Sequence, residues 1–264
     1  MTRRDVVKRL IEESAVHEAG HAVFMWRSQY ELFAVAHAGF REIVLGSYLA
    51  WMHDKPLVLS YGGVRAGLGG VVVRPSVIYI PGTLAAVRRQ LRLDPRLRAL
   101  GGHQQAFADA AAALQRGEPP PSTVEEILQY PHAIGETRAE LRARAKWCRT
   151  TAEHVVISCL AGPMAQAKHK GEDFDFWVEY EEETCFGEDP GHDLVKAYVI
   201  AKDVTRGRRS AATYINRVQE KVAEKLSDPA VWRTITALAG TLIKRRRLSG
   251  DQALRVMRRA WDAA

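Results

Sequence analysis

The sequence predicts an α+β fold that is mainly helical, with one small β-sheet beside the helix that carries the candidate site. Long stretches of the chain repeat apolar residues every three or four positions, as amphipathic helices do. Short aliphatic runs separated by glycines are confined to the N-terminal third, as expected for a few strands joined by turns. The 264 residues are 47% hydrophobic and 26% charged, which are the proportions of a globular protein.

The elements are predicted in the following order. The first helix spans residues 2–27, where no proline interrupts the helical spacing of apolar residues. Short strands are expected at residues 43–45, 57–59 and 71–73. Further helices are predicted at residues 84–115, 135–170, 192–205, 210–226 and 228–244, with a short last one from Ser249. The acidic run at residues 173–189 is interpreted as a solvated loop.

The whole chain, residues 1–264, is expected to form a single domain with a helical insertion at about residues 84–143. No stretch reaches the roughly 20 apolar residues that a membrane-spanning helix needs, and the N-terminus lacks the apolar core of a signal peptide. The three cysteines are scattered, which fits a reducing compartment. These observations predict a cytoplasmic protein without a membrane partner.

Net charge gives a weaker indication of partners. The chain has 38 Lys and Arg against 31 Asp and Glu, a net charge of +7. Such an excess is typical of a solubilising surface. The basic run at residues 244–247 leaves a contact with nucleic acid open as the alternative interpretation.

The candidate site begins with the motif His17-Glu18-Ala19-Gly20-His21 in the first predicted helix. Residues four apart leave the same face of a helix one turn apart, so two imidazoles at this spacing can bind one zinc ion. They leave room for a third ligand and a water molecule. Bound Zn²⁺ lowers the pKa of that water toward about 7, and Glu18 is expected to accept its proton as general base. A pair of ordinary histidines on a helix face is the alternative.

Spacing alone does not identify the third ligand. An extended motif of the metzincin kind would need glycine at position 24 and histidine at position 27, where this chain has Phe24 and Arg27. Glu42 has roughly the spacing of a thermolysin-like third ligand, but it lies beside a predicted strand rather than on a second helix. The remaining candidates are acidic or histidine side chains further along the chain: Glu153, His154, Glu188, His192 and Asp193.

Residues 17–23, His-Glu-Ala-Gly-His-Ala-Val, resemble the peptidase motif of the FtsH-type zinc metallopeptidases. Two later segments resemble landmarks of that family in the same order. Residues 156–166 are similar to its apolar helix that ends in Ala-Ala-Glu, and residues 191–197 to its Asn-Asp-Leu-x-x-Ala-Thr helix. The resemblance implies an FtsH-peptidase-like fold and makes Asp193 the third zinc ligand.

The chain departs from the family pattern at two positions and lacks one module. Gln166 stands where the family has Glu, and His192 stands where it has Asn. His192 is therefore considered as an alternative ligand or as a residue that supports the site from outside. No G-x-x-x-x-G-K followed by Ser or Thr occurs, so the resemblance implies a free-standing peptidase domain that uses no ATP.

In the FtsH-type family a sheet edge beside the active-site helix holds the substrate. The resemblance assigns this role to a strand that contains Gly69, Gly70, Val71, Val72 and Val73. Pairing of backbones along such an edge would position a polypeptide substrate with broad specificity. An ordinary buried strand is the alternative interpretation of this segment.

The function predicted from these observations is that of an ATP-independent zinc metalloendopeptidase, which hydrolyses peptide bonds in unfolded or flexible polypeptides. Two alternatives stay open. The basic helices suggest a DNA-associated regulatory metalloprotease, and the departures at Gln166 and His192 suggest a zinc-stabilised interaction module without turnover.

Overall fold

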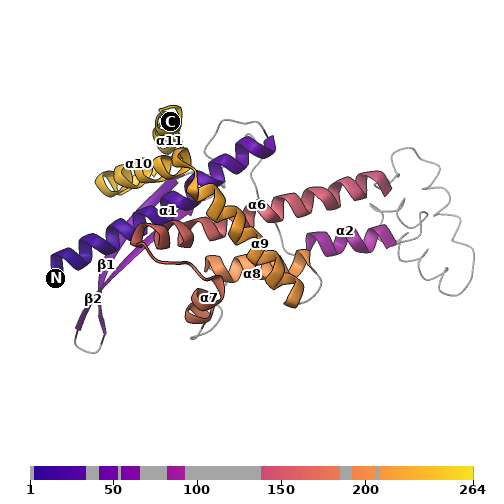
Figure 1. Ribbon diagram of the computed structural model, residues 1–264, viewed down its shortest axis with the longest axis horizontal. Helices are drawn as coiled ribbons and strands as arrows, with labels where there is room; N and C mark the ends of the chain where they lie inside the picture. The colour runs from indigo at the N-terminus through magenta and orange to yellow at the C-terminus, as the bar shows by residue number, and fades with distance from the viewer. Residues whose placement is uncertain are drawn as a thin grey trace, which may run out of the picture. The chain divides into compact units, whose positions relative to one another are not determined.

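The computed structural model describes residues 3–33, 42–52, 55–65, 82–92, 138–184, 192–205 and 208–263 (Figure 1). The chain divides into two compact units. The first combines Met1–Tyr79 with Thr151–Ala264, and the second is Ile80–Thr150. The second unit encloses the stretch 84–143. That this stretch is an insertion stays a prediction.

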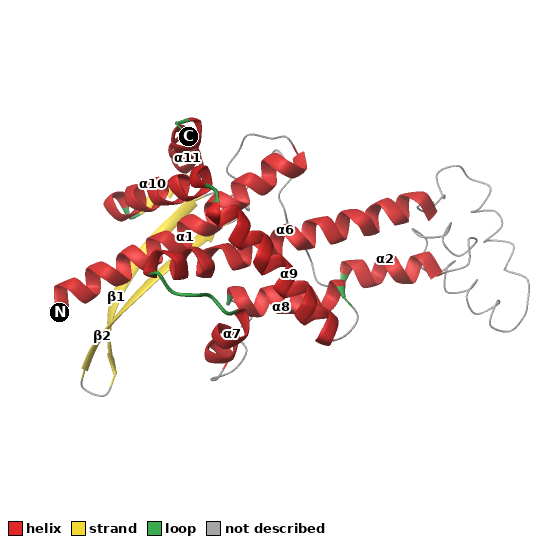
Figure 2. Cartoon of the chain, viewed as in Figure 1, coloured by secondary structure: helices red, strands yellow, loops and turns green. Residues whose placement is uncertain are grey.

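The fold is mostly helical with one small sheet, as the sequence predicts (Figure 2). The helices are α1 (Arg3–Phe33), α2 (Thr83–Arg92), α6 (Arg138–Lys170), α7 (Phe176–Thr184), α8 (Asp193–Val204), α9 (Arg208–Ser227), α10 (Pro229–Arg245) and α11 (Gly250–Asp262). No described helix is long and apolar enough to cross a lipid bilayer.

The sheet has three antiparallel strands in the order β2-β1-β3. β1 (Glu42–Met52) pairs with β2 (Lys55–Arg65) from Glu42 opposite Arg65 to Met52 opposite Lys55. β3 (Arg247–Ser249) pairs with the start of β1, so the sheet joins the two ends of the chain. The sequence analysis missed β3 because a three-residue strand has no pattern of its own. The predicted strand at 71–73 lies outside the described residues.

Two further predictions differ from the structure. The acidic run was expected to be a loop, but Phe176–Thr184 forms α7. Phe176 is fully buried and its ring stacks on that of Tyr180, one turn later. This aromatic face therefore stabilises the helix, while Glu179, Glu181 and Glu182 are exposed to solvent. The helix predicted at 84–115 is described only as far as Arg92.

In the first unit, α1 packs against β1, β2 and α10. α10 begins with Pro229, a residue that is favoured at the first helical position, and the Asp228 side chain accepts a hydrogen bond from the Ala230 N–H. Its inner face buries Ile235, Leu238 and Leu242. The helix that carries the histidine motif thus packs against both the sheet and α10.

Candidate metal centre

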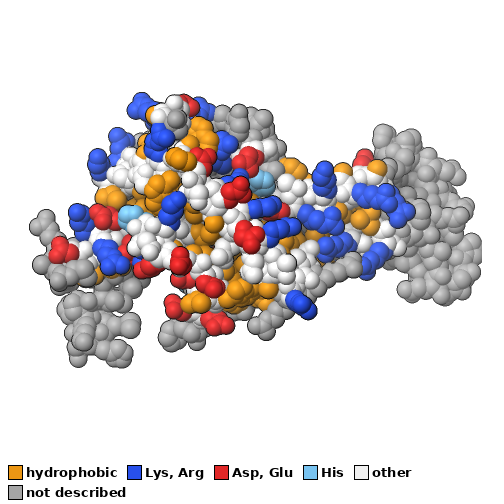
Figure 3. Space-filling model, in the orientation of Figure 1, with side chains coloured by type: hydrophobic (Ala, Val, Ile, Leu, Met, Phe, Trp, Pro, Cys, Tyr) orange, Lys and Arg blue, Asp and Glu red, His pale blue; other side chains and the backbone are white. Residues whose placement is uncertain are grey.

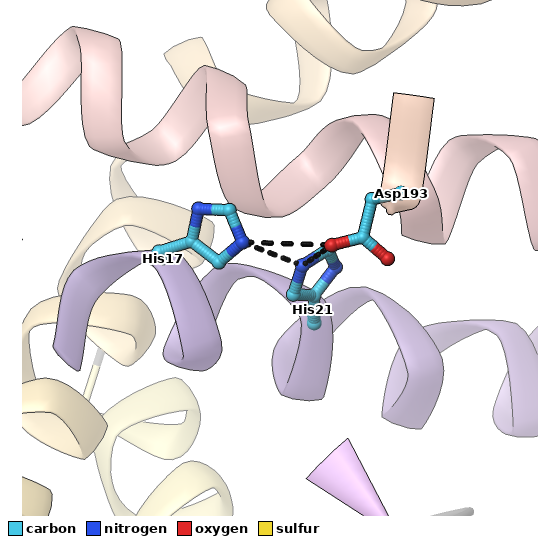
Figure 4. A group of neighbouring side chains, drawn as sticks. All are labelled: His17, His21 and Asp193. Carbon is cyan, nitrogen blue, oxygen red and sulfur yellow. Dashed lines mark hydrogen bonds and ion pairs between the residues drawn. The ribbon is translucent and has the colours of Figure 1, made fainter. Parts of the chain in front are cut away.

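Three side chains converge where the start of α8 meets the middle of α1 (Figure 4). His17 and His21 project from α1, and their Nε2 atoms lie 3.0 Å apart. Asp193, the first residue of α8, places Oδ2 at 2.9 Å from His21 Nε2 and 3.6 Å from His17 Nε2. The structure therefore brings together two of the motif residues and one of the five remaining candidates for a third ligand.

The geometry of this cluster fits a zinc ion. Ligand atoms that lie about 2.0–2.1 Å from a tetrahedral zinc ion are about 3.3–3.4 Å from one another. The three observed separations, 3.0, 2.9 and 3.6 Å, lie on both sides of that value. Two imidazoles and one carboxylate also form a donor set that zinc prefers, and three protein ligands leave a position open. His17, His21 and Asp193 would hold the metal.

The imidazole of His21 is oriented by the backbone of α6. Its Nδ1 donates a hydrogen bond of 2.6 Å to the carbonyl oxygen of Ser158. Because a carbonyl only accepts, the Nδ1 carries the proton, and the lone pair of the neutral ring lies on Nε2, toward Asp193. Pro163 lies inside α6 and has no N–H to donate to the carbonyl of Cys159, the residue that follows Ser158.

The imidazole of His17 is oriented by a side chain of α6. Its Nδ1 donates to Gln166 Oε1 at 3.0 Å, so its Nε2 also faces the cluster. A histidine that binds a metal usually donates its other ring N–H to such an acceptor, which fixes the tautomer. Gln166, which stood out in the sequence as a departure from the FtsH-type pattern, thus contacts a candidate ligand. Both acceptors on α6 are uncharged.

Small residues allow α1 and α6 to approach this closely. A Cβ atom on Gly162 would lie 2.3 Å from His21 Nε2, and one on Gly20 would lie 2.6 Å from the carbonyl oxygen of Ala161. Both distances are too short for any side chain. The element that approaches α1 at Gly20 is therefore α6.

The charges of the cluster favour a bound cation. Burial alone would lower the pKa of His21, but the Asp193 carboxylate outweighs it and raises that pKa to about 9. Burial would raise the pKa of Asp193, yet its contacts with His21 and His17 hold that pKa well below the usual range. A proton on His21 and a metal ion therefore compete for the same lone pair.

Two further groups near the cluster differ in what they can do. Burial raises the pKa of Glu18, although both imidazoles oppose the shift, and a carboxylate with a raised pKa is better suited both to accept and to release a proton. The Cys159 thiol is buried, and burial together with the Asp193 charge raises its pKa to about 12. Cys159 is therefore a neutral thiol rather than a thiolate ligand.

The cluster is open to solvent on one side. The side chains of His17 and Asp193 are 23% and 29% exposed, whereas that of His21 is 9% exposed. Water can therefore reach His17 and Asp193 from outside. Lys196, one turn further along α8, has its Nζ 3.7 Å from Asp193 Oδ1 and adds a positive charge at this opening.

The other candidates for a third ligand lie elsewhere or outside the described residues. Glu153 forms ion pairs with Lys221 and Arg217, and His154 Nδ1 lies 2.9 Å from Ser28 Oγ. His192 is exposed at the N-cap of α8, next to the cluster but not part of it. The side chain of Glu42, the residue Glu188 and the proposed substrate strand at 69–73 are outside the described part of the chain.

The sequence analysis missed the contacts that orient the two imidazoles. Ser158 acts through its backbone, for which the sequence holds no signal. The pair Gly162-Pro163 inside an apolar helix was a usable signal, because glycine and proline are both unfavourable there unless a close contact requires them.

Comparisons with known proteins add no relative. No family model, no curated protein and no solved structure matches the chain. The likeness to FtsH-type peptidases thus depends on the three motifs alone.

Proposed function

We propose that this protein is a zinc-dependent metalloendopeptidase that cleaves unfolded or flexible polypeptides without ATP. The observation that carries the proposal is the convergence of His17, His21 and Asp193, with the buried Glu18 beside them. Zinc, when bound, supplies Lewis-acid chemistry: it lowers the pKa of water and polarises the carbonyl of the scissile bond.

The residues of the chain have separate roles in this proposal. His17, His21 and Asp193 bind the metal, and α6 fixes the direction of both imidazoles through Gln166 and the Ser158 carbonyl. Glu18 accepts a proton from the attacking water and then donates it to the amine that leaves. Its raised pKa supports both steps, because the same group must be a base first and an acid afterwards.

A polypeptide substrate is inferred from the resemblance of residues 17–23 to the FtsH-type motif. No ATP-binding motif occurs in the chain, so folded proteins would not be unfolded by it and flexible segments are the expected substrates. The interaction module without turnover remains the second candidate, since a metal site of this kind can also hold α1, α6 and α8 together.

The test uses Glu18→Gln, with Glu12→Gln on the same helix as control. Glu18→Gln should bind zinc as the wild type does and lose cleavage of a reduced, alkylated protein by about 10²–10⁴-fold. Glu12→Gln should retain both properties, because Glu12 pairs with Lys8 away from the cluster. Undiminished cleavage by Glu18→Gln would refute the peptidase mechanism. A wild type that binds zinc and cleaves nothing would favour the interaction module.

A further inference from the structure

The C-terminal elements carry an exposed set of cations that we call the arginine face. The end of α10, β3 and α11 contact one another. Figure 3 shows Lys and Arg side chains over α10 and α11 at the top of the view. The exposed cations of the arginine face are Lys244, Arg245, Arg246, Arg247, Arg255, Arg258 and Arg259. Between residues 244 and 263 only Asp251 and Asp262 carry negative charge.

The arginines of α11 lie together on its exposed side. Ala253 and Met257 are buried on one side of the helix, whereas Arg255, Arg258 and Arg259 are exposed on the other. Residues three and four apart are neighbours on a helix surface, separated by about 4.5–6 Å along its axis. Arg255 therefore has both Arg258 and Arg259 as neighbours one turn later, and the three arginines form a cluster on the outer side of α11.

Helix dipoles explain only part of this distribution. The negative end of a helix attracts cations, which accounts for Lys244 and Arg245 in the last turn of α10 and for Arg259 in the last turn of α11. It does not account for Arg255, which lies in the middle of α11, away from the negative end of that helix.

We propose that the arginine face binds the phosphate backbone of nucleic acid. Six of its seven cations are arginine, whose planar fork of donors matches phosphate oxygens in two places at once. A membrane surface fits less well, because a helix that lies on lipid inserts large apolar side chains. The exposed large apolar side chains of the described residues are Trp147, Val178 and Val199, none of them on α10, β3 or α11.

Binding of this kind depends on salt in a way that can be counted. Each phosphate contact adds about −0.9 to the slope of log affinity against log salt concentration. We expect the wild type to bind a mixed-sequence DNA duplex of 30 base pairs with a Kd of about 1–100 µM near physiological salt, the range of contacts to the backbone alone. The inference does not depend on the zinc site, and zinc binding serves as the independent check of folding.

The test variant is Arg255→Gln, Arg258→Gln and Arg259→Gln combined. It should bind the duplex at least tenfold more weakly, with a salt slope smaller by about 2–3, and should bind zinc as before. The single variant Arg255→Gln, which leaves most of the face intact, should lose about one unit of slope. An unchanged slope in both variants would overturn the inference.

The matched control removes the same charge from a different exposed segment, in the first half of α6. It combines Arg142→Gln, Lys146→Gln and Arg149→Gln, and it should bind the duplex as the wild type does. An equal loss in the control would show that net charge alone attracts DNA and would overturn the assignment to the arginine face. Equal wild-type affinity for polyglutamate, or tighter binding to phosphatidylserine vesicles, would overturn nucleic acid as the partner.

Discussion

Two histidines lie in the contact between α1 and α6, and their surroundings shift their pKa values in opposite directions. His21 projects from α1, and its Nδ1 donates to the Ser158 carbonyl of α6. His154 projects from α6, and its Nδ1 lies 2.9 Å from Ser28 Oγ of α1. Burial lowers the pKa of His154, and the charges around it largely oppose one another: Glu31 and Glu153 against Lys225 and Lys221. Burial acts on His21 as well, but Asp193 reverses the outcome and raises its pKa to about 9.

The difference shows what distinguishes a candidate metal ligand from a structural histidine in this fold. Burial and one hydrogen bond are common to both residues. What His21 has in addition is a carboxylate at 2.9 Å and a second imidazole at 3.0 Å, all directed at one point. Negative charge and convergent lone pairs, rather than burial, are therefore the property that attracts a cation.

The largest expected effect comes from Asp193→Asn, which removes the negative charge that His21 has beside it and His154 lacks. Zinc affinity should fall by more than about 100-fold, because loss of a ligand exceeds the 10–100-fold cost of losing an outer hydrogen bond. In metal-free protein the pKa of His21 should also fall, in the direction already seen for His154, since burial is then the strongest influence. Titration of the histidine resonances by NMR measures this. A pKa that stays near 9 would contradict the role given to Asp193.

The next effect is expected from Gly162→Ala, which places a methyl group against the His21 ring. The new Cβ would lie 2.3 Å from Nε2 and 2.6 Å from Cε1, so the imidazole must move away from the cluster. We expect a loss of about 1–3 kcal/mol in the free energy of unfolding, together with a marked loss of zinc affinity. Urea unfolding and zinc titration against a chelator measure the two effects.

Gly240→Ala is the matched control for this substitution. Gly240 is also inside a helix, and a Cβ there would meet nothing within 4 Å. The substitution should raise the free energy of unfolding by about 0.5–1 kcal/mol and leave zinc affinity unchanged. If Gly162→Ala behaved in the same way, the close contact between α6 and His21 would be wrong.

A smaller effect is expected from Gln166→Ala, which leaves all three candidate ligands in place. His17 would lose the acceptor of its Nδ1 proton, and zinc affinity should fall by about 10–100-fold. Gln166→Glu keeps an acceptor at this point and should retain zinc binding. Gln219→Ala, which removes an amide whose contact is the Phe174 carbonyl, is the control and should not change zinc affinity. Unchanged zinc affinity in the Gln166→Ala variant would show that His17 does not need this hydrogen bond to bind zinc.

The sequence allowed local features to be predicted better than distant contacts. His17 and His21 share a face because of helical spacing alone, and the structure confirms a helix there. Asp193 follows 172 positions after His21, and reasoning from the residues left five candidates open. Only the resemblance pointed to Asp193, because no periodicity reports which later helix returns to α1.

The same distinction explains the elements that were missed. β3 has three residues and exists because β1 offers an edge to pair with, which is a contact between opposite ends of the chain. The sequence of α7 did contain a signal, since Phe176 and Tyr180 are spaced one turn apart, but the acidic residues between and after them suggested a loop. Aromatic spacing predicts such a short helix better than its charge does.

The smallest expected effect is the contribution of His154 to the pH dependence of the free energy of unfolding. Because the pKa of His154 is lowered in the folded protein, this histidine takes up a proton more readily in the unfolded chain as pH falls below about 6.5. His154 therefore contributes stability that is present above that pH and is lost as pH falls through its folded pKa. His154→Gln should lose about 0.5–1.5 kcal/mol at pH 8 with its hydrogen bond, yet show a flatter decline of the free energy of unfolding between pH 7 and pH 5.

Urea unfolding of metal-free protein measures this decline. Because Glu31, Glu153, Lys221 and Lys225 are present in both proteins, their titration largely cancels in the difference. Parallel curves for variant and wild type would mean that His154 is not neutral by burial, and the contrast with His21 would then have another cause.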